Sequence, residues 1–155
     1  MKHKYKRTPE AVIADWELKR IGQIDKLVAS YTELYREQKS LADNVKATRS
    51  DTERVKGGAA DSDVIGKTIA ALEELEAKIN SKITEVIKLK IDALAVIEEI
   101  GDLTQQGLLI DRYINHKSIK HISADIDRER EWVYKKINRA LDNFYKIEQK
   151  RTNSN

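Results

Sequence analysis

Apolar residues recur at steps of three and four over two long stretches of the chain, and this spacing predicts one face of an α-helix. The first stretch runs from about residue 9 to about residue 46, and a Thr-Pro-Glu run at residues 8–10 is typical of a helix start. The second stretch runs over about residues 65–100. Each predicts a helix of roughly forty residues. The apolar stripe of the first helix consists of Ile13, Trp16, Ile24, Leu27, Tyr31, Leu34, Leu41 and Val45.

The segment between the two stretches, at about residues 47–63, is rich in Ser, Thr, Asp and Lys and contains a Gly-Gly pair. Such a composition cannot bury enough apolar surface to order itself, so it predicts a flexible loop. The loop allows the two long helices to pair antiparallel as a coiled-coil-like hairpin. The alternative is that the apolar stripes pair between two copies of the chain, and the pattern is compatible with both.

Three shorter helices are predicted after Gly101, where the long pattern ends. The first covers about residues 105–114, and the second begins at a capping Ser118. The third presents one apolar face, which consists of Val133, Ile137, Ala140, Leu141 and Phe144. We therefore expect an all-α protein in which residues 1–103 form the long antiparallel hairpin and residues 104–155 form a separate small bundle.

Composition supports the all-helical prediction. The chain has one proline and six glycines, whereas a chain built of β-strands needs many Pro and Gly turns. It has no cysteine, which excludes disulfides and zinc–thiolate sites. No apolar run approaches the roughly 18 residues needed to span a bilayer, and no apolar targeting segment follows the basic N-terminus. We expect a cytoplasmic protein with no membrane partner.

Charge is distributed unevenly along the chain. The formal net charge is +3, but residues 105–155 hold 11 Lys and Arg against 7 Asp and Glu. The remaining residues are close to neutral, with 18 against 19. A basic surplus in the C-terminal bundle favours a polyanionic partner there.

The last two predicted helices have the form of a helix-turn-helix, in which the second helix is longer and basic. Its apolar face would hold it against the bundle, and its other face would meet DNA. Arginine can bond two acceptors of guanine at once, and glutamate can accept from the amino group of cytosine. Lysines on the same face suit phosphates. The candidate DNA-binding residues are Arg128, Arg130, Glu131, Tyr134, Lys135, Asn138 and Arg139.

The C-terminal part of the chain also resembles a known family. Region 4 of bacterial sigma factors is similar to four segments of this chain, at residues 108–114, 122–126, 133–134 and 140–141. The similarity is greatest to the version found in phage transcriptional regulators of the ArpU/RinA type. It implies a DNA-binding regulator of phage or prophage genes, with RNA polymerase as a further partner. Arg130 and Glu131 match the Arg-Glu pair with which sigma factors read promoter DNA.

The resemblance extends weakly into the first hundred residues. The Val-Lys-Gly-Gly run at residues 55–58 and the Leu-Glu-Glu-Leu-Glu run at residues 72–76 fit the loop and second long helix of family members. Two positions depart from the pattern: Glu129 stands in place of a capping serine, and Tyr134 in place of a residue that is often basic. The helix cap is therefore expected to shift to Asp127.

The sequence contains no motif for catalysis. His116 and His121 lie near a turn without a cysteine or a regularly spaced carboxylate, which argues against a metal site. Adjacent carboxylates at residues 73–74 and 98–99 point about 100° apart on a helix, so they cannot work as an acid–base pair. No glycine-rich phosphate loop and no nucleophile motif occurs. We expect no enzyme activity, cofactor, metal ion or small-molecule substrate.

Two further features allow more than one interpretation. Trp132 is expected in the core of the bundle rather than stacked on DNA. The basic stretch at residues 2–7 either contacts phosphate or an acidic protein, or is simply solvated like most short charged ends.

The expected function is that of a transcriptional regulator that binds double-stranded DNA through the C-terminal helix-turn-helix. The long helices would serve dimerisation or partner contact, since two copies on two half-sites bind more tightly than one. The alternative is a structural or adaptor coiled-coil protein that binds another protein and not DNA.

Overall fold

The computed structural model describes the backbone of residues 6–51 and 58–154, and the side chains of residues 6–45 and 63–154. All regular structure in these described residues is helical, which confirms the all-α fold class. The elements in chain order are α1 (Pro9–Asp51), α2 (Gly58–Glu98), α3 (Leu103–Leu109), the π-helix η1 (Ile110–Ile114), α4 (Ile119–Asp125) and α5 (Arg130–Asn153).

Two compact units divide the chain. The first consists of Met1–Ile24 and Val86–Asn155, and the second of Asp25–Glu85. This division differs from the boundary predicted near residue 103, because the first turns of α1 and the last turns of α2 pack with the C-terminal helices. Sequence periodicity predicts that a helix continues, but it does not predict which other helices pack against it.

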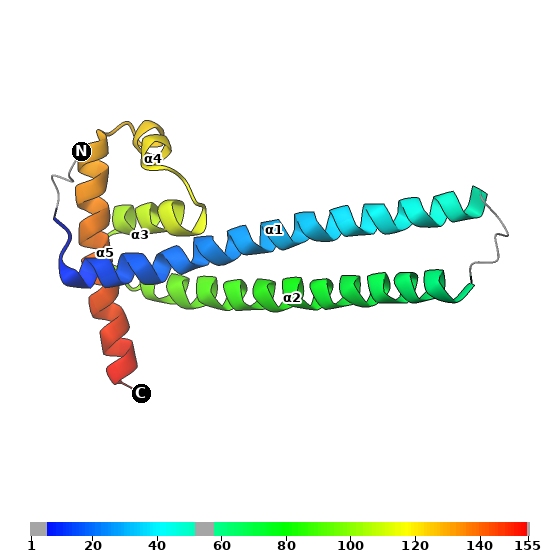
Figure 1. Cartoon of the computed structure of the whole chain (residues 1–155). Coiled ribbons are helices and arrows are strands. Elements are labelled where there is room, and N and C mark those ends of the chain that lie inside the picture. Colours follow the sequence, from blue (N-terminus) through cyan, green and yellow to red (C-terminus); the bar gives the residue numbers. More distant parts are fainter. Residues whose placement is uncertain (1–5, 52–57, 155) are drawn as a thin grey trace. The chain divides into compact units, whose positions relative to one another are not determined.

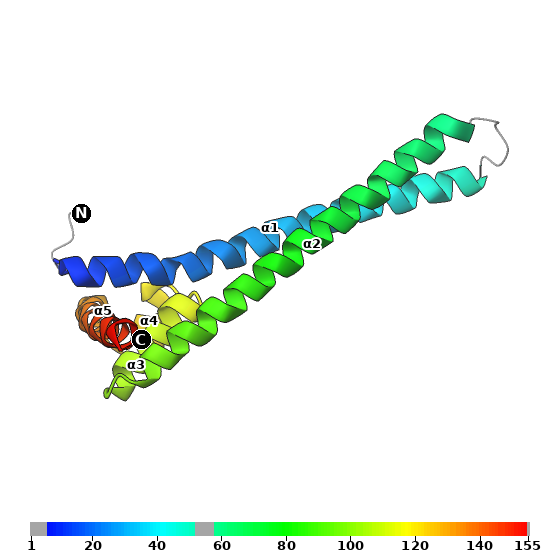
Figure 2. The same ribbon diagram turned by 90° about the horizontal axis from the view of Figure 1, so that it is seen from below.

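The second unit contains the distal parts of α1 and α2, which run antiparallel; they lie side by side in the view of Figure 1 and cross in the view of Figure 2. Side chains of both helices, among them Leu34, Leu72 and Leu75, line a common cavity of about 440 Å³. Helix α1 continues to Asp51 and α2 begins at Gly58, so the predicted loop at residues 47–63 is too long. Residues 52–57 lie outside the described part of the chain.

In the first unit, the buried face of α1 differs from the face that its apolar stripe predicts to be buried. Ala11, Ala14 and Leu18 are buried there, whereas Ile13 and Trp16 are 44% and 71% exposed. The small alanine side chains let the helix backbone approach its neighbours closely, so the face with the larger side chains is left outside. The register predicted from Ile13 and Trp16 is therefore wrong for this part of the helix.

The C-terminal helices largely follow the predicted pattern. Ser118 caps α4 by accepting a hydrogen bond from the backbone N–H of His121, as predicted. Asp102 caps α3, because its side chain accepts from the N–H groups of Thr104 and Gln105. The predicted helix at residues 105–114 is instead α3 followed by the wider π-turns of η1. All five predicted inward residues of α5 are buried: Val133, Ile137, Ala140, Leu141 and Phe144.

Candidate nucleic-acid interface

A tight turn joins α4 to α5 in the first unit. Asp127 lies in the left-handed region at φ 51°, so the chain reverses direction within a few residues. The backbone N–H of Arg128 donates to the carbonyl oxygen of Ser123 at 3.1 Å, and the Ser123 hydroxyl bonds back to the carbonyl of Arg128. These two bonds hold the end of α4 against the start of α5, which is the connection that a helix-turn-helix needs.

The predicted cap of α5 differs from the observed one. Glu129 occupies the N-cap position, and its side chain makes no capping hydrogen bond. Asp127 does not take over this role, because it lies in the turn two residues earlier. The first N–H groups of α5 are thus left without a side-chain cap, at the end of the helix where an anion is favoured.

Polar contacts to the α3 region hold α5 along one side, in addition to its buried face. Lys136 forms an ion pair with Asp102 at the start of α3, with an N–O distance of 3.2 Å. Asn143 donates to the side-chain oxygen of Gln105 on α3 at 2.8 Å. The helix is therefore fixed in rotation about its own axis, and this determines which side chains face outward.

Four of the predicted cationic site residues are exposed: Arg128, Arg130, Lys135 and Arg139. Lys135 and Arg139 share one outward face because they are four residues apart. Arg130 lies in the first turn, and it shares the side of the helix that carries the buried Ile137, seven residues later. It is exposed because this first turn extends past the buried core. Neither Arg130 nor Arg139 forms an ion pair with any residue that the structure describes.

Trp132 stands between two cations rather than in the core. The guanidinium of Arg128 lies 5.0 Å from the centre of its ring, and the ammonium of Lys136 lies 5.9 Å from it. Both distances suit cation–π attraction. Trp132 is half-buried, so the prediction that it belongs to the core is not met. The ring instead orients Arg128 beside the start of α5.

The remaining predicted site residues are partly engaged within the protein. Glu131 forms an ion pair with Lys135 at 3.2 Å, one turn along the helix. Tyr134 and Asn138 are half-buried. The side-chain oxygen of Asn138 accepts a hydrogen bond from Nε of Arg7 at 2.9 Å. Asn138 therefore joins the start of the chain to α5.

Arg7 is one member of a network around the buried Asp15. Asp15 forms ion pairs with Arg7 at 2.9 Å and with Lys19 at 2.8 Å, and it accepts a hydrogen bond from the hydroxyl of Tyr113 on η1. Burial alone would raise the pKa of Asp15, but the hydrogen bonds from Lys19 and Tyr113 and the charge of Arg7 hold it below its usual range. Burial, together with the bond to Asp15, raises the pKa of Tyr113.

The sequence alone does not predict the network around Asp15. Tyr113 lies 98 residues after Asp15 along the chain. Similar charged and apolar residues surround both positions, so the local sequence does not mark Arg7, Asp15 and Tyr113 as partners. Asp15 on an otherwise buried face of α1 was the one available signal, because a buried carboxylate needs partners. That signal becomes visible only once the buried face is known.

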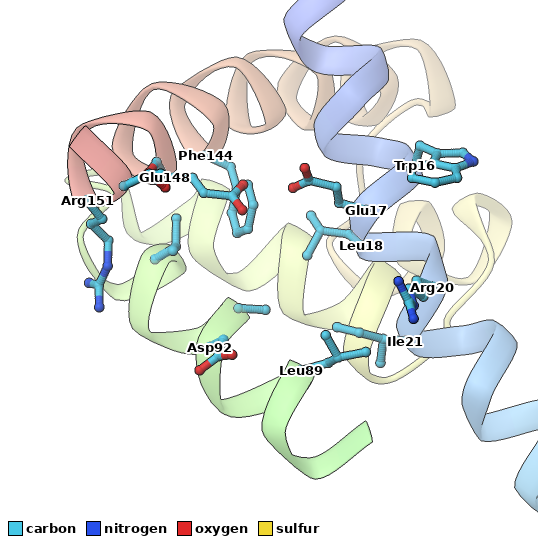
Figure 3. A pocket seen from close by; sticks show the side chains of 13 residues that line it. Trp16, Glu17, Leu18, Arg20, Ile21, Leu89, Asp92, Phe144, Glu148 and Arg151 are labelled. Carbon is cyan, nitrogen blue, oxygen red and sulfur yellow. The ribbon is translucent and has the colours of Figure 1, made fainter. Parts of the chain in front are cut away.

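A second polar cluster lines a cavity of about 520 Å³ in the same unit (Figure 3). Its floor is apolar and includes Leu18, Ile21 and Phe144, and the carboxyl groups of Glu17 on α1 and Glu148 on α5 lie at its wall. Burial and the neighbouring Glu17 raise the pKa of Glu148 to about 7. The raised pKa favours the neutral form of Glu148, and this is compatible with the burial of its Oε2 atom without a hydrogen-bond partner among the described residues.

Metal sites and membrane-spanning helices are two further features that the described residues could contain. No group of three or more His, Asp or Glu side chains in this part of the chain could hold a metal ion. None of the helices, over the residues described, combines the length and the apolar content needed to cross a membrane.

Comparison with known proteins places the chain in a family. A family model described as a protein of unknown function, DUF1492, matches residues 44–144. Because the match covers more than half of the chain, the protein belongs to this family. No curated protein and no solved structure matches the chain.

Proposed function

We propose that this member of the DUF1492 family is a transcriptional regulator that binds double-stranded DNA through α4 and α5. The observation that carries the proposal is the pairing of a tight left-handed turn at Asp127 with an α5 that is buried on one face and cationic on the other. Such a helix can enter the major groove without unfolding, because its buried face already fixes its orientation.

Electrostatics favour DNA as the partner of this surface. Arg128, Arg130, Lys135 and Arg139 gather at the N-terminal half of α5, where the uncapped N–H groups also favour an anion. Of these four cations, only Lys135 forms an ion pair with a carboxylate among the described residues. Arg130 and Glu131 would meet base edges, and Lys135 and Arg139 would meet phosphates. Regulation by DNA binding of this kind requires no chemical reaction.

The resemblance to ArpU/RinA-type regulators and to region 4 of sigma factors adds the biological setting to this proposal. On that basis the targets are phage or prophage promoters in a bacterial cytoplasm, and RNA polymerase is a further partner. Two copies of the chain, joined through the long helices, would present two α5 helices to two half-sites and increase the affinity.

An adaptor function is the second candidate, and one observation favours it. Between residues 25 and 85 no described side chain is buried, although α1 and α2 carry many apolar residues there. Large hydrophobic side chains such as Leu41 and Val64 are more than half exposed. A surface of this kind is typical of protein–protein contact. It is compatible with a regulator that dimerises and with an adaptor that binds only another protein.

Fluorescence anisotropy with a labelled duplex, over a series of salt concentrations, tests the proposal. We expect the parent protein to bind a duplex of mixed sequence at about 50 mM salt and to release it steeply as salt rises. On a site selected from random DNA, Arg130→Ala should lose roughly 1–3 kcal/mol, mostly as discrimination between bases. Lys135→Ala should weaken all duplexes alike and reduce the salt slope by about one phosphate contact.

Arg36→Ala is the matched control, because Arg36 is an exposed arginine of α1 in the other unit. It should bind like the parent. Val133→Asp is expected to abolish binding indirectly, since it buries an unpaired charge, and circular dichroism will show the loss of structure. An adaptor would show no salt-dependent binding of any duplex, and this outcome would overturn the proposal.

A further inference from the structure

Trp132 lies on the side of α5 that carries the proposed phosphate contacts. It comes three residues before Lys135 and seven before Arg139, and side chains at these spacings share one side of a helix. Arg128 comes four residues before Trp132, just ahead of the first turn of α5. Its guanidinium lies 5.0 Å from the centre of the Trp132 ring, so the ring joins Arg128 to this side of the helix. All four residues belong to the first compact unit.

The Trp132 ring is itself held in place through α3. Nζ of Lys136 lies 5.9 Å from the centre of the ring and 3.2 Å from Oδ2 of Asp102. The other carboxylate oxygen of Asp102 accepts hydrogen bonds from the N–H groups of Thr104 and Gln105 at the start of α3, at 2.9 and 3.2 Å. Asp102 cannot move away without uncapping α3, so Lys136 remains beside the ring and limits the positions that the ring can take.

Arg128 keeps its hydrogen-bond donors available for another molecule. It is exposed, and its guanidinium makes no hydrogen bond or ion pair with any residue that the structure describes. A cation that lies over the face of an aromatic ring does not use its N–H donors on a protein acceptor. The carboxylates of Asp102 and Glu131 also lie near this side of α5, but they are engaged by Lys136 and Lys135. The ring therefore restrains Arg128 without neutralising its charge.

We infer that Trp132 is a positioning residue of the proposed DNA-binding surface, and that its ring holds Arg128 where Arg128 binds the phosphate backbone of the duplex. The inference rests on the proposed function. An arginine that is already restrained in the free protein loses less side-chain entropy on binding, so the same contact gives a higher affinity. A phosphate is the expected partner because Arg128 precedes the first turn of α5, and it is the residues of that turn that reach base edges.

Affinity and salt dependence separate a positioning role from a direct charge contact. Both are measured by anisotropy with one labelled duplex of mixed sequence. Arg128→Ala should lower the affinity and reduce the slope of log K against log salt by about 0.9. Trp132→Leu keeps every charge, so it should lower the affinity roughly two- to fivefold and leave the slope unchanged. Trp132→Tyr keeps an aromatic face and should recover most of the affinity. Trp16→Leu, which removes a tryptophan of α1 that is 71% exposed, is the matched control and should bind like the parent.

A double variant shows whether Trp132 acts through Arg128. In the Arg128→Ala background, Trp132→Leu should cause no further loss of affinity, because the residue that the ring positions is already gone. Additive losses would mean that Trp132 contacts DNA itself or only stabilises the fold, and would overturn the inference. A spectroscopic test does not depend on the folding of Trp132→Leu. In a Trp16→Phe background, Arg128→Ala should change the fluorescence emission of Trp132 in the absence of DNA, and unchanged emission would overturn the contact.

Failure of the inference and failure of the proposed function give different results. If Trp132→Leu binds with the affinity of the parent while Arg139→Ala binds more weakly, the ring does not position Arg128 and the proposed function stands. If the parent itself shows no salt-dependent binding of a duplex, both are overturned.

Discussion

Asn138 illustrates how a side chain of the proposed DNA-binding face also contributes to folding. It was selected as a DNA contact because it lies on the exposed side of a basic helix, and its carbonyl oxygen is engaged by Arg7 at 2.9 Å. Its amide group retains two donors for another partner. A loss of DNA affinity in an Asn138 variant would therefore combine a lost DNA contact with a displaced Arg7, so Lys135 and Arg139 are better probes of the interface.

Glu148 gives the protein a pH-dependent stability. Its pKa is raised from 4.5 to about 7, first by burial and then by Glu17. Between these two values the folded protein binds more protons than the unfolded chain, so the free energy of unfolding falls as pH rises from 4.5 to 7. Glu148→Gln mimics the protonated form, and after discounting for solvent screening of this half-buried group it should stabilise the protein by roughly 1–2 kcal/mol at pH 8.

Thermal unfolding at pH 5 and pH 8 measures this effect. The stabilisation by Glu148→Gln should be present at pH 8 and nearly absent at pH 5, where Glu148 of the parent is already protonated. Glu76→Gln removes an exposed carboxylate of the other unit and should leave the pH dependence unchanged. An equal effect of Glu148→Gln at both pH values would show that folding does not raise the pKa of Glu148.

At the level of the elements, the turn between α4 and α5 carries strain at one residue. Asp127 has φ 51°, a region that costs most L-residues about 1–2 kcal/mol, and its side chain makes no hydrogen bond or ion pair with any described residue. Asp127→Gly should relieve this cost and, after allowing for the greater freedom of glycine in the unfolded chain, stabilise the protein by about 0.5–1 kcal/mol. Chemical denaturation is the measurement.

Two companion variants separate backbone from charge at this turn. Asp127→Asn removes the charge but tolerates the left-handed region, so its unfolding free energy should stay close to that of the parent. Asp127→Val should be destabilised, because a β-branched residue is strained at positive φ. If Gly and Val behave alike, the turn does not hold residue 127 in this conformation.

The long helices show why element ends are harder to predict than element existence. A polar composition predicted a loop over residues 47–63, yet α1 reaches Asp51 and α2 begins at Gly58. A helix is defined by its backbone hydrogen bonds and not by its apolar stripe, so loss of the stripe does not mark the end of the helix.

On the scale of the whole molecule, α1 and α2 each belong to both compact units. In the first unit their end segments help to build the core around α5. In the second unit the described parts of α1 and α2 pack only against each other. The second unit buries none of its described side chains, whereas the first buries large residues such as Ile21, Ile97 and Leu141. Apolar surface left exposed in this way weakens an isolated two-helix pair.

We predict that the second unit covers this surface by self-association. Sedimentation at micromolar concentration should show a species heavier than the 17.8 kDa of one chain. Leu41→Lys, which places a charge on a side chain that is 55% exposed in the second unit, should shift the protein toward that single-chain mass.

Leu103→Lys is the matched control, because Leu103 is even more exposed, at 80%, but lies in the first unit. It should leave the assembly intact. A parent that sediments only as a single chain would refute self-association, and a loss of assembly in Leu103→Lys but not in Leu41→Lys would place the contact in the first unit instead.

The sequence by itself determined the elements whose evidence is local. The period of apolar residues predicted two long helices and the buried face of α5, and a serine before an apolar run predicted the cap of α4. Both depend on residues within a few turns of each other, so they can be recognised without knowing the neighbours. The exposed cations at the start of α5 follow from the same local pattern.

Only the tertiary structure decided which residues act together across the chain. The buried face of α1, the hydrogen bond from Arg7 to Asn138, the network at Asp15 and the raised pKa of Glu148 beside Glu17 all depend on segments far apart in sequence. The physical reason is that a side chain's burial, hydrogen-bond partners and pKa depend on what lies within a few ångströms of it. In this chain the residues up to Ile24 and those from Val86 onward meet in one compact unit.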